Sequence, residues 1–282
     1  MKSLIEEVFK FRDGASVNRI GYGAMQLTGP GVFGDVTDRE KAKKVLQTAV
    51  LKGVNFIDTA EAYGPQFNES LIAEALHPYP PDLFIATKGG YYRPGPDQWI
   101  PKGDPLFIRE NIEGSLRRLR VDAIDLWQLH RIDPHVPVDV TLEPVVRAME
   151  AGKIKRFGLS EVDIHQLEQV RKILPVSSVQ NRYNLADKRW EQMIDHTAKL
   201  DIAFIPWFPL GSGPEQLAQL LTNVASANNS SPARTALAWM LRRSPNIILI
   251  PGTSSIEHLL DNLSATLLDL SAGDFEKLND YE

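Results

Sequence analysis

The stretch Asn55-Phe56-Ile57-Asp58-Thr59-Ala60-Glu61-Ala62-Tyr63-Gly64 contains a short apolar run that stops at a carboxylate, with a tyrosine five residues later. Such a run predicts a buried strand, with Asp58 at its C-terminal end and Tyr63 on the loop that follows. A carboxylate and a phenol held together there could form an acid–base pair. The alternative is a helix-capping aspartate and a rim aromatic, so the neighbouring strands decide between the two interpretations.

The same pattern, a short apolar run followed by amphipathic helical sequence, repeats along the chain. Short apolar strands that alternate with helices indicate a parallel sheet that is buried on both faces. We therefore predict a (β/α)₈ TIM barrel in which residues 1–282 form a single domain. A doubly wound open sheet is the alternative, but no glycine-rich fingerprint follows the first predicted strand. The eight strands are expected to end near Gln26, Asp58, Lys88, His130, Ser160, Gln180, Trp207 and Ile250.

Turn and capping signals divide the chain further. Val8-Phe9-Lys10-Phe11 and Ala15-Ser16-Val17 flank an Asp-Gly turn sequence, which predicts an N-terminal β-hairpin. Thr37-Asp38-Arg39-Glu40 has the pattern of a capping box, and Gly53 is expected to end the helix that it opens. Other expected elements are a first strand over 20–26, a last strand over 246–250, helices over 67–76, 106–119, 142–151, 164–173, 190–200 and 232–242, and a closing helix after Ser271.

Composition excludes several classes of function. The 31 basic and 36 acidic residues give a net charge of −5 without a long basic run, which argues against nucleic acid or an anionic membrane as a partner. The absence of cysteine excludes disulfides, thiolate metal sites and a cysteine nucleophile. The N-terminus is polar, and no stretch approaches the roughly 18 apolar residues of a transmembrane helix. We expect a cytoplasmic protein, and no metal site, because the histidines lack metal-binding spacing.

Three consecutive predicted strands end at residues that could act together: Asp58 with Tyr63, Lys88 and His130. Active sites of barrel enzymes lie at the C-terminal ends of the strands. A lysine ammonium favours a neighbouring phenolate, so we expect the pKa of Tyr63 to lie below its usual value of about 10. Asp58 would hold Lys88 charged, and a neutral His130 would donate a hydrogen bond to a substrate oxygen. Each residue alone has a structural explanation, but their conjunction predicts a site for carbonyl reduction.

The motif Asp58-Thr59-Ala60-x-x-Tyr63-Gly64 and the strand ends Thr87-Lys88 and Leu129-His130 resemble those of the aldo-keto reductases. The resemblance spans essentially the whole chain and implies that the hairpin closes the bottom of the barrel. It implies that Tyr63 is the general acid, that Lys88 and Asp58 adjust its pKa, and that His130 orients the carbonyl. The hydride would come from C4 of a reduced nicotinamide, because no amino acid side chain donates hydride.

The resemblance also implies a set of cofactor-binding residues. NADP(H) is favoured over NAD(H), because Thr253 and Ser254 remain in the segment that binds the adenosine phosphate. The chain departs from the family at Glu161, where asparagine is usual, and at Gly252 and His258, where many relatives carry lysine or arginine. The implied contacts are Met25 with the cofactor, Ser160 and Gln180 with the carboxamide, Trp207 stacked on the nicotinamide, Leu210 and Ser212 with the pyrophosphate, and Gly252, Thr253, Ser254, His258 and Asn262 with the adenosine phosphate.

The substrate is expected to be a small-molecule carbonyl compound. Loop aromatics could wall an apolar pocket or could anchor the loops themselves; they are Phe33, Tyr91, Tyr92 and Trp99. The sequence at 21–27 resembles bacterial reductases related to pyridoxal reductase, which implies aromatic or pyridoxal-type aldehydes. Two alternatives are a lyase in which Lys88 forms a Schiff base and a non-catalytic, nicotinamide-sensing subunit. A monomer is the default expectation, because a plugged barrel buries its own core.

Overall fold

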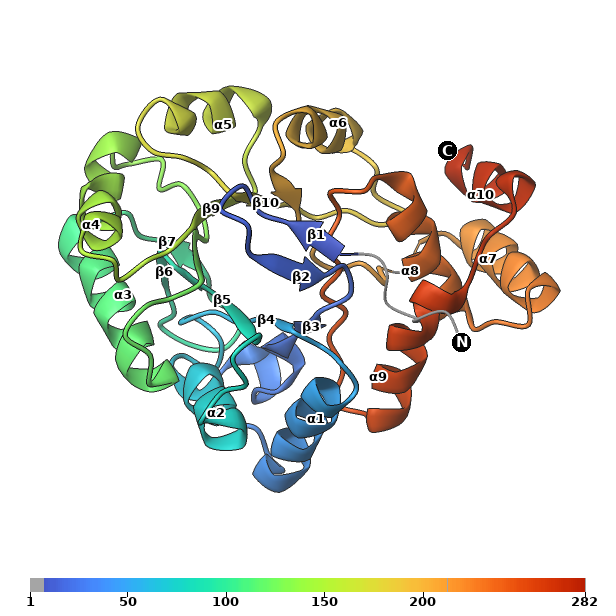
Figure 1. Cartoon of the computed structure of the whole chain (residues 1–282), viewed down its shortest axis with the longest axis horizontal. Helices are drawn as coiled ribbons and strands as arrows, with labels where there is room; N and C mark the ends of the chain where they lie inside the picture. Colours follow the sequence, from blue (N-terminus) through green and yellow to red (C-terminus); the bar gives the residue numbers. More distant parts are fainter. Residues whose placement is uncertain (1–7, 212, 282) are drawn as a thin grey trace.

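The computed structural model describes residues 8–211 and 213–281. Parallel strands form a curled sheet in the order β11-β10-β9-β8-β5-β4-β3 (Figure 1). The strands are short and almost entirely buried, as expected for a sheet covered on both faces. Their bounds are β3 (Tyr22–Gly23), β4 (Phe56–Asp58), β5 (Phe84–Gly89), β8 (Leu126–Leu129), β9 (Phe157–Ser160), β10 (Ser178–Gln180) and β11 (Ala203–Phe204).

Residues 247–249 close this sheet into a barrel, because they connect its two edges. Ile247 bridges to Phe204 and Leu249 bridges to Ile20, both in parallel. The backbone N–H of Ile248 donates to Phe204 at 2.9 Å, and that of Gly21 donates to Leu249 at 2.8 Å. The predicted eight-stranded barrel is therefore confirmed.

The first strand is shorter than expected over 20–26. After Gly23 the chain turns into the 3-10 helix η1 (Ala24–Gln26). The buried side-chain amide of Asn68 donates to the carbonyls of Ala24 and Leu27, both at 2.9 Å, so the turn is stabilised by a partner distant in sequence. A strand pattern alone does not contain this long-range contact.

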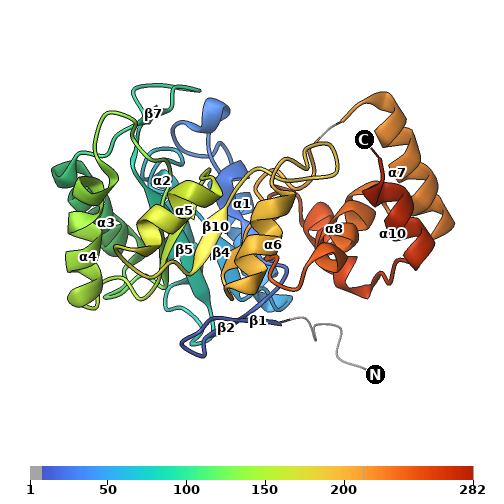
Figure 2. The same cartoon turned by 90° about the horizontal axis from the view of Figure 1, so that it is seen from above.

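Helices surround the barrel, and α7 and α10 pack outside α8 (Figures 1 and 2). Most lie within a few residues of their predicted bounds, but no bounds were predicted for α7 or α9. No helix in the described ranges is both long and apolar enough to cross a bilayer. The bounds are α1 (Arg39–Leu51), α2 (Phe67–Leu76), α3 (Pro105–Leu119), α4 (Val138–Glu150), α5 (Ile164–Arg171), α6 (Glu191–Lys199), α7 (Glu215–Ala227), α8 (Pro232–Arg243), α9 (Ile256–Leu263) and α10 (Ala272–Asn279).

The caps of these helices follow the sequence signals with one correction. Asp38, rather than Thr37, caps α1, because its carboxylate accepts a hydrogen bond from the N–H of Lys41 at 2.9 Å. Gly53 follows the helix with a φ of 93°, as a glycine after a helix commonly does. Ser231 caps α8 and Ser271 caps α10, each through a hydrogen bond that its side chain accepts from a backbone N–H of the first turn.

The N-terminal hairpin closes the bottom of the barrel, as expected. It consists of β1 (Val8–Lys10) and β2 (Ser16–Asn18) and lies across the middle of the helical ring in Figure 1 and below the strands in Figure 2. The Phe11 ring stacks on Phe84 with centroids 5.2 Å apart, inside a buried cluster that joins the hairpin to the strands. Burying a phenylalanine side chain stabilises the fold by about 1.5–3 kcal/mol. The opposite end of the barrel remains open for a site.

Candidate functional site

The structure brings Asp58, Tyr63, Lys88 and His130 together at the C-terminal end of the barrel. The Lys88 side chain is fully buried and forms the centre of the group. Its Nζ donates to Asp58 Oδ1 at 2.5 Å, to the Thr59 carbonyl at 2.8 Å and to the Tyr63 hydroxyl at 3.2 Å. Three acceptors around one ammonium satisfy its donors, which is the condition for burying a charge.

The second carboxylate oxygen of Asp58 receives two further hydrogen bonds. Gln180 donates to Oδ2 at 2.9 Å and Gln128 donates to it at 3.3 Å. Gln128 in turn accepts from the Ser178 hydroxyl at 3.2 Å. Sequence reasoning missed Gln128, although a glutamine inside an otherwise apolar strand was a usable signal. These amides hold Asp58 in the position in which it pairs with Lys88.

His130 follows β8 and is buried among aromatic rings. Desolvation lowers the pKa of His130 well below its ordinary value, and the nearby Lys88, Arg131 and Arg93 cations add to the effect. The imidazole is therefore neutral at neutral pH, as the sequence predicted. Its Nδ1 has no hydrogen-bond partner within residues 8–211 and 213–281. Its ring centroid lies 6.0 Å from that of Tyr63.

The expected lowering of the Tyr63 pKa is wrong. Burial raises the pKa of Tyr63, and the Lys88 ammonium opposes this rise only in part. Desolvation also acts to lower the pKa of Lys88, but the Asp58 carboxylate outweighs it, so the Lys88 pKa is raised. The phenol is thus held protonated beside a permanent cation, which is a suitable state for a proton donor.

A pocket of about 640 Å³ lies above these residues, within the usual size range of small-molecule sites. Most of the sequence-predicted cofactor residues contribute to its lining. Lys88 lies beneath the lining, and Ser212 lies outside the described residues. The predicted residues that line the pocket are Met25, Asp58, Tyr63, His130, Ser160, Gln180, Trp207, Leu210 and Gly252.

In the segment predicted to bind the adenosine phosphate, Gly252 lines the pocket, whereas Thr253, Ser254, His258 and Asn262 are not part of its lining. The Thr253 carbonyl accepts a hydrogen bond from the Tyr22 hydroxyl at 2.6 Å, and Ser255 caps α9. Ser254 and His258 are exposed, whereas Asn262 is buried on α9. Backbone N–H groups at a capped helix start suit a phosphate group, so this segment fits the cofactor.

Glu161 holds Trp207 in the wall of the pocket. Its Oε1 accepts from the Trp207 indole N–H at 2.6 Å and from the Arg182 backbone N–H at 2.5 Å. Its φ is +53°, an uncommon conformation for a residue other than glycine. Glu161 therefore acts here as an acceptor that orients the aromatic ring expected to stack on the nicotinamide. Sequence reasoning identified the unusual residue but did not identify this partner.

Two arginines that sequence reasoning missed also belong to the site. Arg131 lines the pocket, and its Nη1 donates to the His130 carbonyl at 2.6 Å and to the Ser160 hydroxyl at 3.0 Å. Arg93 connects three loops, because it donates to the carbonyls of Gly31, Ala62 and Gln98 at 2.7–2.9 Å. An arginine directly after a strand-end histidine was the available signal for Arg131.

The aromatic residues expected to wall the pocket divide into two groups. Tyr91 and Trp99 line it, and their rings lie 4.6 Å and 6.1 Å from the His130 ring. Tyr91 and Tyr92 form the short strand β6 (Tyr91–Tyr92), which pairs with β7 (Ile100–Pro101). Adjacent residues of a strand face opposite sides, so Tyr92 points away from the pocket and is 48% exposed. Phe33 is not in the lining either; Val32 lines the pocket at that point.

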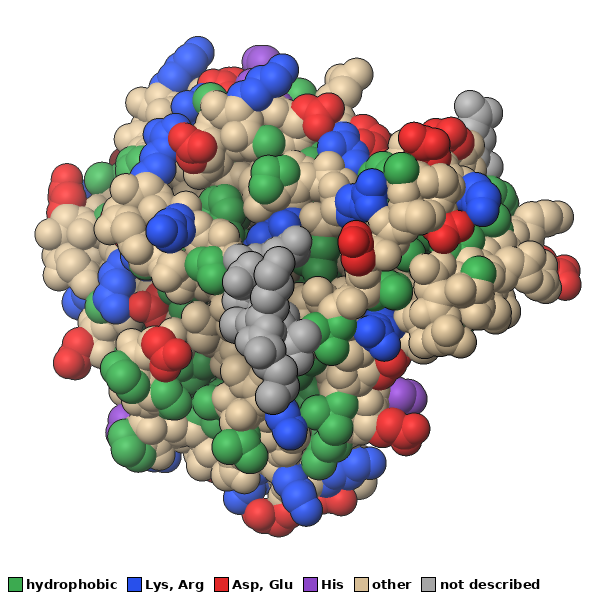
Figure 3. All heavy atoms as spheres, turned by 45° about the vertical axis from the view of Figure 1, so that its right-hand side comes forward, with side chains coloured by type: hydrophobic (Ala, Val, Ile, Leu, Met, Phe, Trp, Pro, Cys, Tyr) green, Lys and Arg blue, Asp and Glu red, His purple; other side chains and the backbone are tan. Residues whose placement is uncertain are grey.

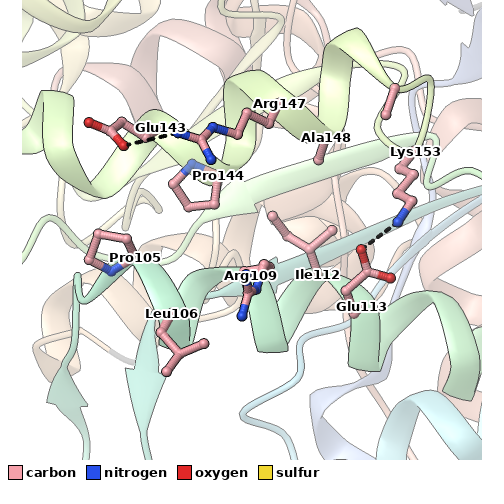
Figure 4. A pocket seen from close by; sticks show the side chains of 11 residues that line it. Pro105, Leu106, Arg109, Ile112, Glu113, Glu143, Pro144, Arg147, Ala148 and Lys153 are labelled. Carbon is pink, nitrogen blue, oxygen red and sulfur yellow. Dashed lines mark hydrogen bonds and ion pairs between the residues drawn. The ribbon is translucent and has the colours of Figure 1, made fainter.

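A groove between α3 and α4 contains none of the strand-end residues, and its polar lining includes the ion pairs Lys153–Glu113 and Arg147–Glu143 (Figure 4). Acidic and basic side chains are interspersed over the face drawn in Figure 3. Across the described parts of the chain, no three or more His, Asp or Glu side chains are grouped as metal ligands.

Solved structures of aldo-keto reductases have the same fold. A thermostable aldo-keto reductase crystallised with the inhibitor epalrestat superposes with a TM-score of 0.86 at 27% identity, covering 96% of this chain and 98% of that one. An aldo-keto reductase from Klebsiella pneumoniae in complex with NADPH gives a TM-score of 0.83 at 24% identity, covering 98% and 94%. The architecture is that of this class of oxidoreductase.

Sequence comparison identifies the family. The pattern that defines the aldo/keto reductase family matches residues 19–282. A pyridoxine 4-dehydrogenase from Escherichia coli is 43% identical over 262 residues, which cover 91% of this chain and 92% of that enzyme. An uncharacterised oxidoreductase from Schizosaccharomyces pombe is 43% identical over 265 residues, covering 94% and 86%. The chain belongs to the aldo/keto reductase family.

Proposed function

We propose that this protein reduces aldehyde or ketone carbonyls to alcohols with NADPH. The observation that carries the proposal is the buried Lys88 ammonium, which contacts both Asp58 and the hydroxyl of Tyr63 at the base of the pocket. A protonated phenol, a fixed cation and a neutral imidazole at one point are the groups that protonation of a developing alkoxide requires.

Each residue of this group has a defined part in the proposed reaction. A bound reduced nicotinamide supplies the hydride from its C4. Tyr63 gives its phenolic proton to the carbonyl oxygen, and Lys88, 3.2 Å away, stabilises the phenolate that remains. Asp58 keeps Lys88 charged. The neutral His130 donates a hydrogen bond to the carbonyl oxygen as its negative charge grows.

The cofactor would lie along the pocket wall and over α9. Ser160 and Gln180 would contact the carboxamide, Trp207 would stack on the ring, and Met25 would lie beside them. NADP(H) is preferred to NAD(H) in this proposal, and the NADPH complex of the Klebsiella pneumoniae protein supports the choice. Further contacts are proposed for Leu210, Ser212, Gly252, Thr253, Ser254, His258 and Asn262.

The burial of Lys88 argues against the lyase alternative. A Schiff base requires an accessible and neutral amine. Lys88 has no exposed surface, and the Asp58 carboxylate keeps its pKa raised. Its ammonium is therefore placed to act on Tyr63 rather than on a substrate carbon.

The proposed substrates are aromatic aldehydes, including pyridoxal-type aldehydes. The rings of Tyr91 and Trp99 form an aromatic wall beside His130, and a relative is a pyridoxine 4-dehydrogenase. Initial rates over a panel of aldehydes and ketones with NADPH and with NADH test the proposal. We expect turnover of aromatic aldehydes with a preference for NADPH. Tight cofactor binding without turnover of any substrate would instead support the nicotinamide-sensing alternative.

Three further predictions of the sequence belong with this proposal. We propose that residues 1–282 act as one catalytic domain, that the protein works as a monomer, and that it resides in the cytoplasm. Size-exclusion chromatography with light scattering tests the second of these.

A further inference from the structure

Arg131 places an uncompensated positive charge in the pocket. It lies next to His130 at the end of β8, and the residue lines the same pocket as Tyr63. Its Nη1 donates to the His130 carbonyl and to the Ser160 hydroxyl, and the Tyr91 hydroxyl is a further hydrogen-bond partner of the guanidinium. A guanidinium is a planar fork of five N–H donors, so donors remain for an acceptor beyond these three partners.

The charges around the pocket differ in how they are neutralised. Lys88 is paired with Asp58, and the carboxylate of Glu161 is bonded to Trp207 and to the Arg182 backbone. In the described part of the chain, no carboxylate lies within ion-pair distance of Arg131. Its field reaches the reacting groups, since it contributes to lowering the pKa of His130 and opposes the rise at Tyr63.

The aromatic wall limits which anion could approach this cation. The Arg131 guanidinium lies 5.5 Å from the centre of the Tyr91 ring, and Tyr91 in turn packs on Trp99 with centroids 5.3 Å apart. A flat ring fits between aromatic surfaces better than a small aliphatic anion does. Arg131 lines the same pocket as Tyr63 and His130 and acts electrostatically on both, so its charge lies near a carbonyl oxygen that these two residues bind.

We propose that Arg131 is a specificity-determining residue that selects aromatic aldehydes with an ionised hydroxyl ortho to the aldehyde group. In such a substrate the phenolate and the carbonyl oxygen lie on the same side of the molecule. The carbonyl oxygen contacts Tyr63 and His130 while the phenolate accepts charge-assisted hydrogen bonds from Arg131. This inference rests on the proposed function and names the substrate class of the same site.

A matched pair of substrates isolates the charge. The ratio of kcat/KM for 2-hydroxybenzaldehyde to that for 2-methoxybenzaldehyde is measured in the wild type, in Arg131→Met and in Arg131→Lys. Methionine keeps the length of the side chain without its charge, and lysine keeps the charge without the fork. Arg109→Met is the control, because Arg109 is exposed in the groove of Figure 4.

We expect the wild-type ratio to be at least about tenfold, and Arg131→Met to reduce it about tenfold, mainly through KM for the hydroxylated aldehyde. Arg131→Lys should retain part of the preference, and Arg109→Met all of it. A wild-type ratio near one, or an equal loss for both substrates in Arg131→Met, would overturn the proposal. Because Arg131 also contacts Ser160, a role confined to the cofactor site would produce that equal loss.

A binding measurement keeps the proposal testable when a variant turns over too slowly. Quenching of tryptophan fluorescence by 2-hydroxybenzaldehyde gives a Kd without catalysis, because Trp99 and Trp207 line the pocket. We expect a weaker Kd in Arg131→Met for this aldehyde and an unchanged Kd for the methoxy compound; equal Kd values in both proteins contradict the role of Arg131. Failure of the wild type to reduce any aldehyde would contradict the proposed function instead, and this result is distinct from a loss of the ratio.

Discussion

Burial and the Lys88 ammonium act on the pKa of Tyr63 in opposite directions, and burial has the larger effect. Burial alone favours a neutral phenol and disfavours a charged amine. The Asp58 carboxylate compensates for the burial of the amine: it pairs with the Lys88 ammonium and holds it 3.2 Å from the phenol oxygen. The four side chains could be predicted from strand-end positions, but the direction of the Tyr63 pKa could not. It depends on how much water the finished pocket excludes, and strand ends do not specify that.

Replacing Lys88 with methionine separates the effect of burial on the Tyr63 pKa from the effect of the Lys88 charge. We expect Lys88→Met to reduce kcat at least about a hundredfold and to move the alkaline limb of the pH–rate profile upward, because the Tyr63 pKa loses its cationic neighbour. Removing one partner of a buried ion pair should also lower the free energy of unfolding by about 3–5 kcal/mol. The double variant Asp58→Asn/Lys88→Met is the control, since it removes both charges. An unchanged alkaline limb in Lys88→Met would contradict this role.

Glu161 is expected to act on cofactor binding through Trp207. Glu161→Ala removes the acceptor of the indole N–H, and the loss of a charged hydrogen bond is worth about 1.5–3 kcal/mol. We therefore expect the Kd for NADPH, measured by fluorescence titration, to weaken about tenfold or more. Glu161→Gln is the matched control, because its carbonyl oxygen can still accept both hydrogen bonds. Equal affinities in the Ala variant and the wild type would show that Glu161 does not orient the ring.

At the scale of elements, alternating apolar strands and capped helices could be predicted because they depend on local patterns. The strand ends at Asp58, Lys88 and Ser160 lie within one residue of their expected positions. The turn after Gly23 and the β6–β7 hairpin could not be predicted in the same way. The turn depends on hydrogen bonds from Asn68, and Arg93 links the hairpin to two distant loops. Contacts between residues far apart in sequence leave no periodic signal.

The loop between β4 and α2 contains a buried acid that makes stability depend on pH. Desolvation and the nearby Glu69 raise the pKa of Glu61 from 4.5 to about 7. A carboxyl whose folded-state pKa is raised favours the folded state when protonated. Its contribution to stability is therefore lost as pH rises from about 4.5 through 7, and this loss amounts to about 3 kcal/mol at most.

Glu61→Gln tests this linkage, because glutamine is neutral at every pH. Urea unfolding at pH 5, 6, 7 and 8 should show the variant gaining stability over the wild type as pH rises, with the largest difference above pH 7. The same pH dependence in both proteins would mean that Glu61 does not carry the effect.

At the scale of the whole molecule, the two ends of the barrel have separate tasks. The hairpin fills the bottom with Phe9, Phe11 and Val17, whereas the open end gathers reactive side chains from β4, β5, β8 and the following loops. The overall barrel was predictable from eight repeated units. The sequence pattern predicts an eighth strand that closes the barrel. In the structure residues 247–249 close it through isolated bridges and do not form a regular strand.

Replacement of Tyr63 by phenylalanine tests the central claim most directly, because it removes one hydroxyl and keeps the ring. Carbonyl reduction and NADPH binding are measured on the same preparation, the first by single turnover and the second by fluorescence titration. The proposed mechanism predicts that reduction falls at least about a thousandfold, while the Kd for NADPH stays within about twofold. A Tyr63→Phe variant that reduces aldehydes at the wild-type rate would contradict it.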